Sequence, residues 1–116
     1  MRVLVVDDEV SVCSAIAEFL RDQGFDVDEA YDGARALLLA EEQGENISAV
    51  LTDINMPEID GIAMWQRMKP LVPSTCKIVF MSGLAQKYRQ DGLKLPGEFL
   101  QKPFSFAKLL KNLASP

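Results

Sequence analysis

A small set of acidic, hydroxyl and amine side chains in this 116-residue sequence shares one feature: each closely follows a short apolar segment. The set consists of Asp7, Asp8, Asp53, Ser82 and Lys102. If these side chains meet, three carboxylates stand beside one hydroxyl and one ammonium group. At about 6 Å and an effective dielectric constant of about 20, each carboxylate pair repels by roughly 2–3 kcal/mol. Such a cluster therefore needs a cation.

The chemistry of these groups indicates which cation would suit them. Oxygen ligands favour a hard ion, and Mg²⁺ binds one or two carboxylates, keeps several waters and accepts phosphate oxygens. A carboxylate can also act as a nucleophile and form an aspartyl phosphate. Phosphoryl transfer depends mainly on positioning and charge neutralisation. Mg²⁺, the ammonium of Lys102, and the hydroxyl of Ser82 or a backbone N–H would each hold one phosphoryl oxygen.

Composition excludes several other classes of site. The sequence contains no histidine, which removes Ser–His–Asp and Cys–His nucleophiles, zinc sites that use histidine, and a phosphohistidine of its own. Its two cysteines, Cys13 and Cys76, show no metal-binding spacing and no disulfide framework, which predicts a reducing, cytoplasmic setting. The length predicts one domain over residues 1–116, without a signal peptide or membrane span.

The charges are distributed unevenly along the chain. Residues 1–62 carry three basic and fifteen acidic side chains, a net charge of −12. Residues 63–116 carry nine basic and two acidic side chains, a net charge of +7. This asymmetry favours a cation site in the first half and a basic docking surface in the second. The basic residues are too dispersed to predict direct nucleic-acid binding.

Short apolar segments alternate with segments of helical periodicity throughout the chain. Strands are expected over 3–6, 25–30, 47–52, 77–81 and 98–101, and helices over 10–23, 33–43, 60–69 and a last segment that begins after Ser105. Residues 84–91 are polar and weakly helical, so a fourth helix there is expected to be short, mobile or partly unwound. This alternation predicts an α/β fold with a parallel sheet. Ligands then bind beyond the carboxyl ends of the strands, where the polar set gathers.

Four motifs resemble the receiver domain of bacterial response regulators, in order and over the whole chain: DDE at 7–9, LTDINMPEIDG at 51–61, MSG at 81–83 and FLQKPF at 99–104. The resemblance implies a flavodoxin-like (βα)5 fold, with a five-stranded parallel sheet in the order 2-1-3-4-5 and helices on both faces. The segment LPGEFLQKPF at 95–104 is more similar to receivers of hybrid histidine kinases than to those of transcription factors.

The resemblance also implies a role for each residue of the predicted metal site. Asp53 would be the phosphoacceptor and a Mg²⁺ ligand. Asp8 would bind Mg²⁺ directly, Asp7 would act largely through water, and the backbone carbonyl of Asn55 would complete the protein ligands. Lys102 would contact the phosphoryl group.

Other matching positions would shape or transmit the response. Ser82 would swing toward the phosphoryl group, and Phe99 would be the aromatic residue that switches with it. The Lys102–Pro103 peptide bond would be cis. Pro57 and Gly61 would shape the turn beside the phosphoacceptor.

The implied function is a phosphorylation-controlled switch in a two-component phosphorelay. A histidine kinase or histidine phosphotransfer protein would donate the phosphoryl group, and the chain would catalyse only its own phosphorylation and dephosphorylation. The surface around the fourth helix, fifth strand and fifth helix would be remodelled. The domain would stand alone or belong to a longer chain with a kinase or effector domain. It would bind neither nucleic acid nor membrane directly, and dimerisation on activation, common in the family, stays open.

Simpler explanations exist for each residue. Asp7 and Asp8 could cap a helix, Ser82 could be a turn residue, and Phe99 could be ordinary core. Asp53 could form a turn, and Lys102 could be a solvated surface lysine. Three other functional classes are alternatives. An aspartyl phosphatase or phosphomutase needs an Asp-x-Asp pattern and a cap domain, and a flavin or nucleotide carrier needs a Gly-rich phosphate loop. The third is a receiver that has become only an interaction module.

Overall fold

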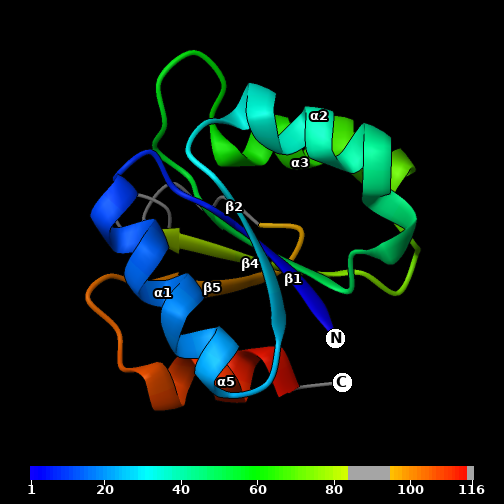
Figure 1. Ribbon diagram of the computed structural model, residues 1–116. Helices are drawn as coiled ribbons and strands as arrows, with labels where there is room; N and C mark the ends of the chain where they lie inside the picture. Colours follow the sequence, from blue (N-terminus) through cyan, green and yellow to red (C-terminus); the bar gives the residue numbers. More distant parts are fainter. Residues whose placement is uncertain (84–94, 115–116) are drawn as a thin grey trace.

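The computed structural model describes residues 1–83 and 95–114 and shows a parallel sheet with helices on both faces (Figure 1). The five strands are β1 (Arg2–Val6), β2 (Asp26–Ala30), β3 (Ala49–Asp53), β4 (Lys77–Ser82) and β5 (Glu98–Gln101). The α-helices are α1 (Val10–Asp22), α2 (Gly33–Gln43), α3 (Gly61–Met68) and α5 (Phe106–Ala114). The strand order is β2-β1-β3-β4-β5, all parallel, so the expected flavodoxin-like topology is confirmed. None of the helices described has the length and apolar character that a bilayer crossing requires.

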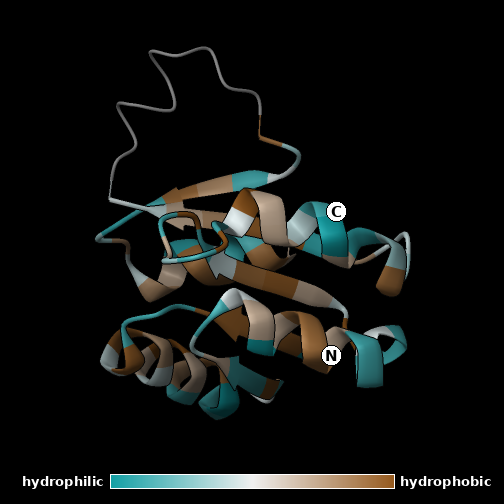
Figure 2. Cartoon of the chain, turned by 90° about the horizontal axis from the view of Figure 1, so that it is seen from above, coloured by the Kyte–Doolittle hydropathy of each residue, from teal (hydrophilic) through white to brown (hydrophobic). Residues whose placement is uncertain are grey.

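Alternation along the central strands sends side chains into two separate cores. In β1, Val3 and Val5 face the core beneath α1 and α5, whereas Leu4 and Val6 face the core beneath α2 and α3. All four are fully buried, as expected for a strand covered on both faces. The two helix layers are separate in Figure 1, and Figure 2 shows apolar colouring along the strands between them.

Strand β2 lies at an edge of the sheet, and polar side chains attach it to its neighbours. Arg2 of β1 forms an ion pair with Asp28, with Nε and Oδ2 2.7 Å apart. Glu29 accepts three side-chain hydrogen bonds, from Ser14, Arg21 and Tyr31, at 3.0, 2.9 and 3.1 Å. Burial alone would raise the pKa of Glu29, but these bonds outweigh burial and lower it. The bonds from Ser14 and Arg21 fix α1 against the sheet.

The strands that lead into the polar cluster have boundaries different from those expected. Strand β3 begins at Ala49, two residues later than expected. A 3-10 helix, η1 (Gly44–Asn46), precedes it, and the Ile47 N–H donates to the Gly44 carbonyl at the end of this helix. Strand β3 extends through Asp53, paired with Met81, and β4 extends through Ser82, paired with Gln101. Both residues therefore end strands instead of following them. The expectation of a short fourth helix over 84–91 falls outside the described residues.

The turn between β3 and α3 presses the helix start against the strand end. The Gly61 N–H donates to the Ile54 carbonyl at 2.9 Å, and a Cβ at Gly61 would overlap the Asp53 carbonyl oxygen. Asp60 caps α3 by accepting a hydrogen bond from the Ala63 N–H at 2.7 Å. The helix therefore starts one residue later than expected, and it ends in a second 3-10 helix, η2 (Lys69–Leu71). Only glycine allows this approach at position 61.

Gly61→Ala should lower the free energy of unfolding by about 1–3 kcal/mol, because two backbone segments must separate to admit the new methyl group. Gly83→Ala is the matched control, since a Cβ there meets nothing within 4 Å. The control should change stability by no more than about 0.5 kcal/mol. Urea denaturation of both variants measures the difference. Equal midpoints would contradict the close approach at Gly61.

Candidate functional site

The structure places the polar set at one edge of the sheet, where the carboxyl ends of the strands meet. Asp7 lies directly after β1, Asp53 and Ser82 end β3 and β4, and Lys102 lies directly after β5. Asp7 and Ser82 are fully buried and Asp53 is 6% exposed, whereas Asp8 is exposed. Residues far apart in the sequence thus form one site, as expected for an open parallel sheet.

Three carboxylates crowd this edge. One oxygen each from Asp7, Asp8 and Asp53 lies within 4.8 Å of the other two. Asp7 is held in place, because its Oδ1 accepts a hydrogen bond from the Glu9 N–H at 2.9 Å and its own N–H donates to the Ala30 carbonyl at 3.1 Å. A donor set made only of carboxylate oxygens at this spacing suits a hard divalent ion such as Mg²⁺.

Lys102 supplies a positive charge inside the carboxylate cluster. Its Nζ lies 2.8 Å from Asp7 Oδ2 and 3.4 Å from Asp53 Oδ2. Burial alone would lower the pKa of Lys102, but the hydrogen bond and charge of Asp7, together with the charge of Asp53, outweigh burial and raise it. Lys102 is therefore protonated at neutral pH. Its backbone N–H donates to the Ser82 carbonyl at 2.9 Å, which joins the ends of β5 and β4.

The site disfavours the charged form of Asp53 relative to its protonated form, compared with the same group in water. Burial is the largest cause of its raised pKa, and the nearby charge of Asp7 adds to the effect. Lys102 and the backbone N–H of Asn55 act in the opposite direction without cancelling it. Any cation that binds beside Asp53 would relieve this cost.

Asn55 reaches the site with its side chain, a contact that was missed from the sequence. Its Nδ2 donates to Ser82 Oγ at 3.1 Å. The family resemblance implies a role only for the backbone carbonyl of Asn55. The residue type shows that the side chain can donate a hydrogen bond, but the partner depends on how β3 and β4 pair.

Phe99 lies outside the polar cluster, on edge strand β5. It is half-buried, pairs in register with Phe80 of β4 and packs against the core beneath α2 and α3. Because Phe80 and Ser82 are two residues apart on β4, the side chains of Ser82 and Phe99 point to the same face of the sheet. The switching role of Phe99 stays a prediction, and so does ordinary core packing.

The turn after Asp53 contains a left-handed residue. Glu58 has a φ of 70°, and the Ile59 N–H donates to the Pro57 carbonyl at 2.8 Å, the hydrogen bond of a γ-turn. Left-handed conformations of residues other than glycine are uncommon and cluster at functional sites. The sequence had drawn attention to Pro57 and Gly61 in this turn, but not to Glu58. The Lys102–Pro103 peptide bond is cis, as the resemblance implied.

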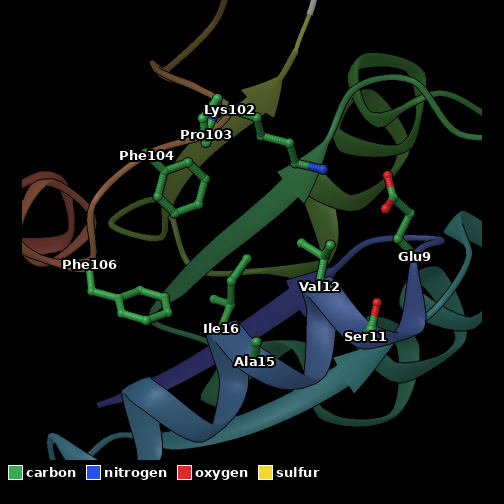
Figure 3. A pocket seen from close by; sticks show the side chains of 9 residues that line it. All are labelled: Glu9, Ser11, Val12, Ala15, Ile16, Lys102, Pro103, Phe104 and Phe106. Atoms are coloured by element: carbon green, nitrogen blue, oxygen red, sulfur yellow. The ribbon is translucent and has the colours of Figure 1, made fainter.

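A groove of about 540 Å³ opens beside the site, between α1 and the segment after β5. Figure 3 shows the Lys102 amine and the Glu9 carboxylate at one end of the groove and the rings of Phe104 and Phe106 toward the other. The remaining lining residues are Ser11, Val12, Ala15, Ile16 and Pro103. Phe106 stacks on Phe19 of α1, with ring centroids 4.2 Å apart. The groove was not predicted, since it depends on how α1 packs against the segment leading into α5.

Known proteins share this arrangement of elements. A family model described as the response regulator receiver domain matches residues 3–114. The sensor kinase CckA of Brucella abortus (strain 2308) is 35% identical over 109 residues, which are 92% of this chain and 11% of that protein. Across curated relatives that it matches, the chain spans between 11% and 50% of their length.

Solved structures show the same fold. The crystal structure of the receiver domain from the hybrid histidine kinase CckA superposes with a TM-score of 0.81 at 33% identity, covering 99% of this chain and 100% of that chain. The CheX–CheY–BeF3–Mg²⁺ complex from Borrelia burgdorferi contains a chain that superposes with a TM-score of 0.84 at 28% identity. That match covers 97% of this chain and 86% of the other.

Asp53→Asn should raise the free energy of unfolding of the metal-free protein at neutral pH by about 1 kcal/mol or more, since it removes a charge that burial and Asp7 disfavour. A carboxyl group whose pKa is raised in the folded state destabilises the fold at pH values above that pKa, where the group is charged. The cost disappears below the pKa of the unfolded state, because the group is then protonated in both states. The difference between variant and wild type should therefore be largest at neutral pH and shrink under acidic conditions.

Urea denaturation with a chelator present, from neutral pH down to about pH 4, would measure this difference. Asp8→Asn is the matched control, because it removes the same charge from the exposed member of the cluster. Its effect should be smaller. A difference for Asp53→Asn that did not change with pH would contradict the raised pKa.

Proposed function

Because the chain belongs to the response regulator receiver domain family of two-component systems, we propose that it is a signalling switch that accepts a phosphoryl group on Asp53 in a magnesium-dependent reaction. The position of Asp53 carries the proposal. Its carboxylate is 6% exposed, lies 3.4 Å from Lys102 Nζ and shares the strand edge with Asp7 and Asp8. As in the receiver family, the donor would be a histidine kinase or a histidine phosphotransfer protein, because these 116 residues contain no histidine that could carry the phosphoryl group.

Asp7 and Asp8 suit supporting roles better than the role of nucleophile. Asp7 is fully buried, and its two oxygens accept hydrogen bonds from Lys102 Nζ and the Glu9 N–H. Asp8 is exposed in the loop after β1, where solvent competes for its carboxylate. Asp53 ends a central strand, which fixes its direction, and retains enough exposure for a donor to approach. Its burial also weakens the hydration of the attacking oxygen.

The residues present fit a magnesium ion. Three carboxylates offer oxygens within 4.8 Å of one another, and the carbonyl of Asn55 follows in the same turn. Asp8, Asp53 and this carbonyl would hold the ion directly. Asp7 would act through water, since both its oxygens already accept hydrogen bonds. When bound, Mg²⁺ neutralises charge on the phosphoryl oxygens. The related CheY complex, which contains BeF3 and Mg²⁺, supports the choice of ion.

The chain's own residues position the reaction. An oxygen of Asp53 forms a bond to phosphorus as the bond from phosphorus to the donor atom breaks, and the electron pair of that bond leaves with the donor. Lys102, fixed by Asp7 at 2.8 Å, holds one phosphoryl oxygen. The hydroxyl of Ser82 turns to hold another. Water then attacks the phosphorus and releases inorganic phosphate, which restores Asp53. In this proposal the domain catalyses only these two reactions of its own aspartate.

Phosphorylation shifts an equilibrium between two conformations. The phosphoryl group adds a charge of roughly −1.5 to −2 at the strand edge. Ser82 moves toward it, and Phe99, on the same face of the sheet, occupies the space that Ser82 leaves. The surface around β5 and α5 changes as a result. A difference of a few kcal/mol in affinity between the two conformations is enough for such a shift.

The groove beside Lys102 supports a protein as the phosphoryl donor. It runs from the site, at Glu9 and Lys102, along the apolar side chains between α1 and the segment after β5. A helix of the donor with an apolar face would fit there and bring its phosphorylated side chain toward Asp53. The mainly apolar lining favours this over a small charged donor.

The domain, residues 1–116, acts within a signalling pathway that includes longer chains. It covers 100% of the CckA receiver-domain structure but only 11% of the Brucella CckA sensor kinase. We propose a cytoplasmic setting and a parent chain with a kinase or effector domain.

Incubation with acetyl phosphate and Mg²⁺ should add a single phosphoryl group to the wild-type protein, visible by intact-mass spectrometry. Asp53→Asn should show no adduct, and chelation of Mg²⁺ should abolish it in the wild type. Lys102→Met should form the adduct at least about tenfold more slowly, because it removes a charge that stabilises the transferring group. An adduct that persists in Asp53→Asn would refute the assigned acceptor.

Lys108→Met is the matched control for Lys102→Met. Lys108 is an exposed lysine of α5, outside the site. Its substitution removes the same charge from the same half of the chain, and phosphorylation should proceed at the wild-type rate. Equal slowing in both variants would assign the effect to net charge instead of to the site.

A further inference from the structure

The hydrogen bond between Asn55 and Ser82 joins two groups that the proposed switch would have to separate. Asn55 Nδ2 donates to Ser82 Oγ at 3.1 Å, between residues 27 positions apart. Resting on the proposed function, we propose that the Asn55 side chain is a positioning residue that holds Ser82 in its resting orientation. The bond then opposes the movement of Ser82 toward a phosphoryl group on Asp53.

The backbone around Asn55 gives its side chain a fixed base. The preceding residue, Ile54, donates its N–H to the Met81 carbonyl at 2.9 Å, and its own carbonyl accepts from the Gly61 N–H at 2.9 Å. The Asn55 N–H faces the carboxylate of Asp53. The side-chain amide therefore starts from a backbone anchored to β4, to α3 and to the phosphoacceptor, and it can hold Ser82 in a defined direction.

The backbone of Ser82 is also fixed, so its response to phosphorylation is confined to the side chain. Its carbonyl accepts a hydrogen bond from the Lys102 N–H at 2.9 Å, and the residue pairs with Gln101 in the β4–β5 ladder. Ser82 is fully buried. Movement of its hydroxyl toward Asp53 is then mainly a rotation about the Cα–Cβ bond, and that rotation breaks the bond to Asn55.

A neutral hydrogen bond of this kind has a modest net effect because water competes for an exposed donor. Asn55 is exposed, and a typical net contribution corresponds to a factor of about two to ten in an equilibrium constant. Since the bond exists only in the resting arrangement, removing it should favour the active arrangement by that factor. The effect should appear in the binding of a phosphoryl mimic more than in the binding of Mg²⁺, because substitution of the side chain leaves the Asn55 carbonyl in place.

The test is a titration with beryllofluoride at saturating Mg²⁺, followed by calorimetry, on wild type, Asn55→Ala, Ser82→Ala and the double variant. Asn55→Ala should bind beryllofluoride about two- to tenfold more tightly than wild type, with Mg²⁺ affinity changed less than twofold. In the Ser82→Ala background, Asn55→Ala should have no further effect. Glu58→Asn is the control, because it changes an exposed residue of the same turn. Asparagine tolerates the left-handed conformation found at this position.

Urea denaturation of the same proteins without ligand checks that each folds and provides a second measurement. If the bond is present, the decreases in unfolding midpoint caused by Asn55→Ala and by Ser82→Ala should add up to more than the decrease in the double variant. Strictly additive effects would overturn the proposal, and so would equal effects of Asn55→Ala on mimic binding in both backgrounds.

Failure of the proposed function has a different signature. Wild-type protein that binds Mg²⁺ but not beryllofluoride would refute the phosphoacceptor role, and the positioning role would be refuted with it. Tight, Asp53-dependent binding by wild type, combined with no change in Asn55→Ala, would refute the positioning role alone.

Discussion

The confinement of three carboxylates to one strand edge, with a lysine ammonium among them, is the constraint on which the rest of the structure depends. Asp7 is fully buried, and a buried carboxylate is stable only when it is paired and hydrogen-bonded. Lys102 supplies that pair at 2.8 Å but is shared with Asp53 at 3.4 Å. Burial, together with the nearby charge of Asp7, raises the pKa of Asp53, so the site is ready to accept a cation.

The fold maintains this unfavourable arrangement by fixing the backbone around it. The central strands are buried on both faces, so the ends that carry Asp7, Asp53 and Ser82 cannot relax apart without loss of core packing. The hydrogen bonds to Glu29 hold α1, which begins just after Glu9, against β2. Gly61 allows α3 to start in contact with the end of β3. The packing of the central strands, of α1 and of α3 therefore offsets the repulsion between the carboxylates.

Local patterns made most of the fold predictable. The α2 boundaries agree with the expected 33–43, because helical periodicity and the Asp32 cap are local features. Gly24, just beyond the expected helix over 10–23, has a φ of 94°, a conformation that favours glycine. The polar set followed from the rule that parallel strands end at one edge. The expected start of β3 was wrong by two residues, because Ile47, which ends the preceding 3-10 helix, and Ser48 connect that helix to the strand.

The features missed from the sequence all depend on contacts between distant segments. The Asn55–Ser82 bond requires the pairing of β3 with β4, and the groove requires the packing of α1 against the segment after β5. Residue types alone indicate what Asn55 or Phe104 can do, but not which partner each one meets. Two domains with the same carboxylates and lysine can therefore differ in contacts of this kind.

Strand β5 is where a change of charge at Asp53 can become a change of shape. Among the strands described, β5 pairs only with β4, so one of its edges is free of the ladder that holds the central strands. Lys102, directly after it, contacts Asp53, and Phe99 lies three residues earlier, half-buried against the core beneath α2 and α3. In the proposed switch, more negative charge at Asp53 would attract the ammonium group of Lys102, which directly follows this strand, more strongly. Because β1 and β3 are buried on both faces and β5 is only partly buried, the proposed response would be largest at the β5 edge.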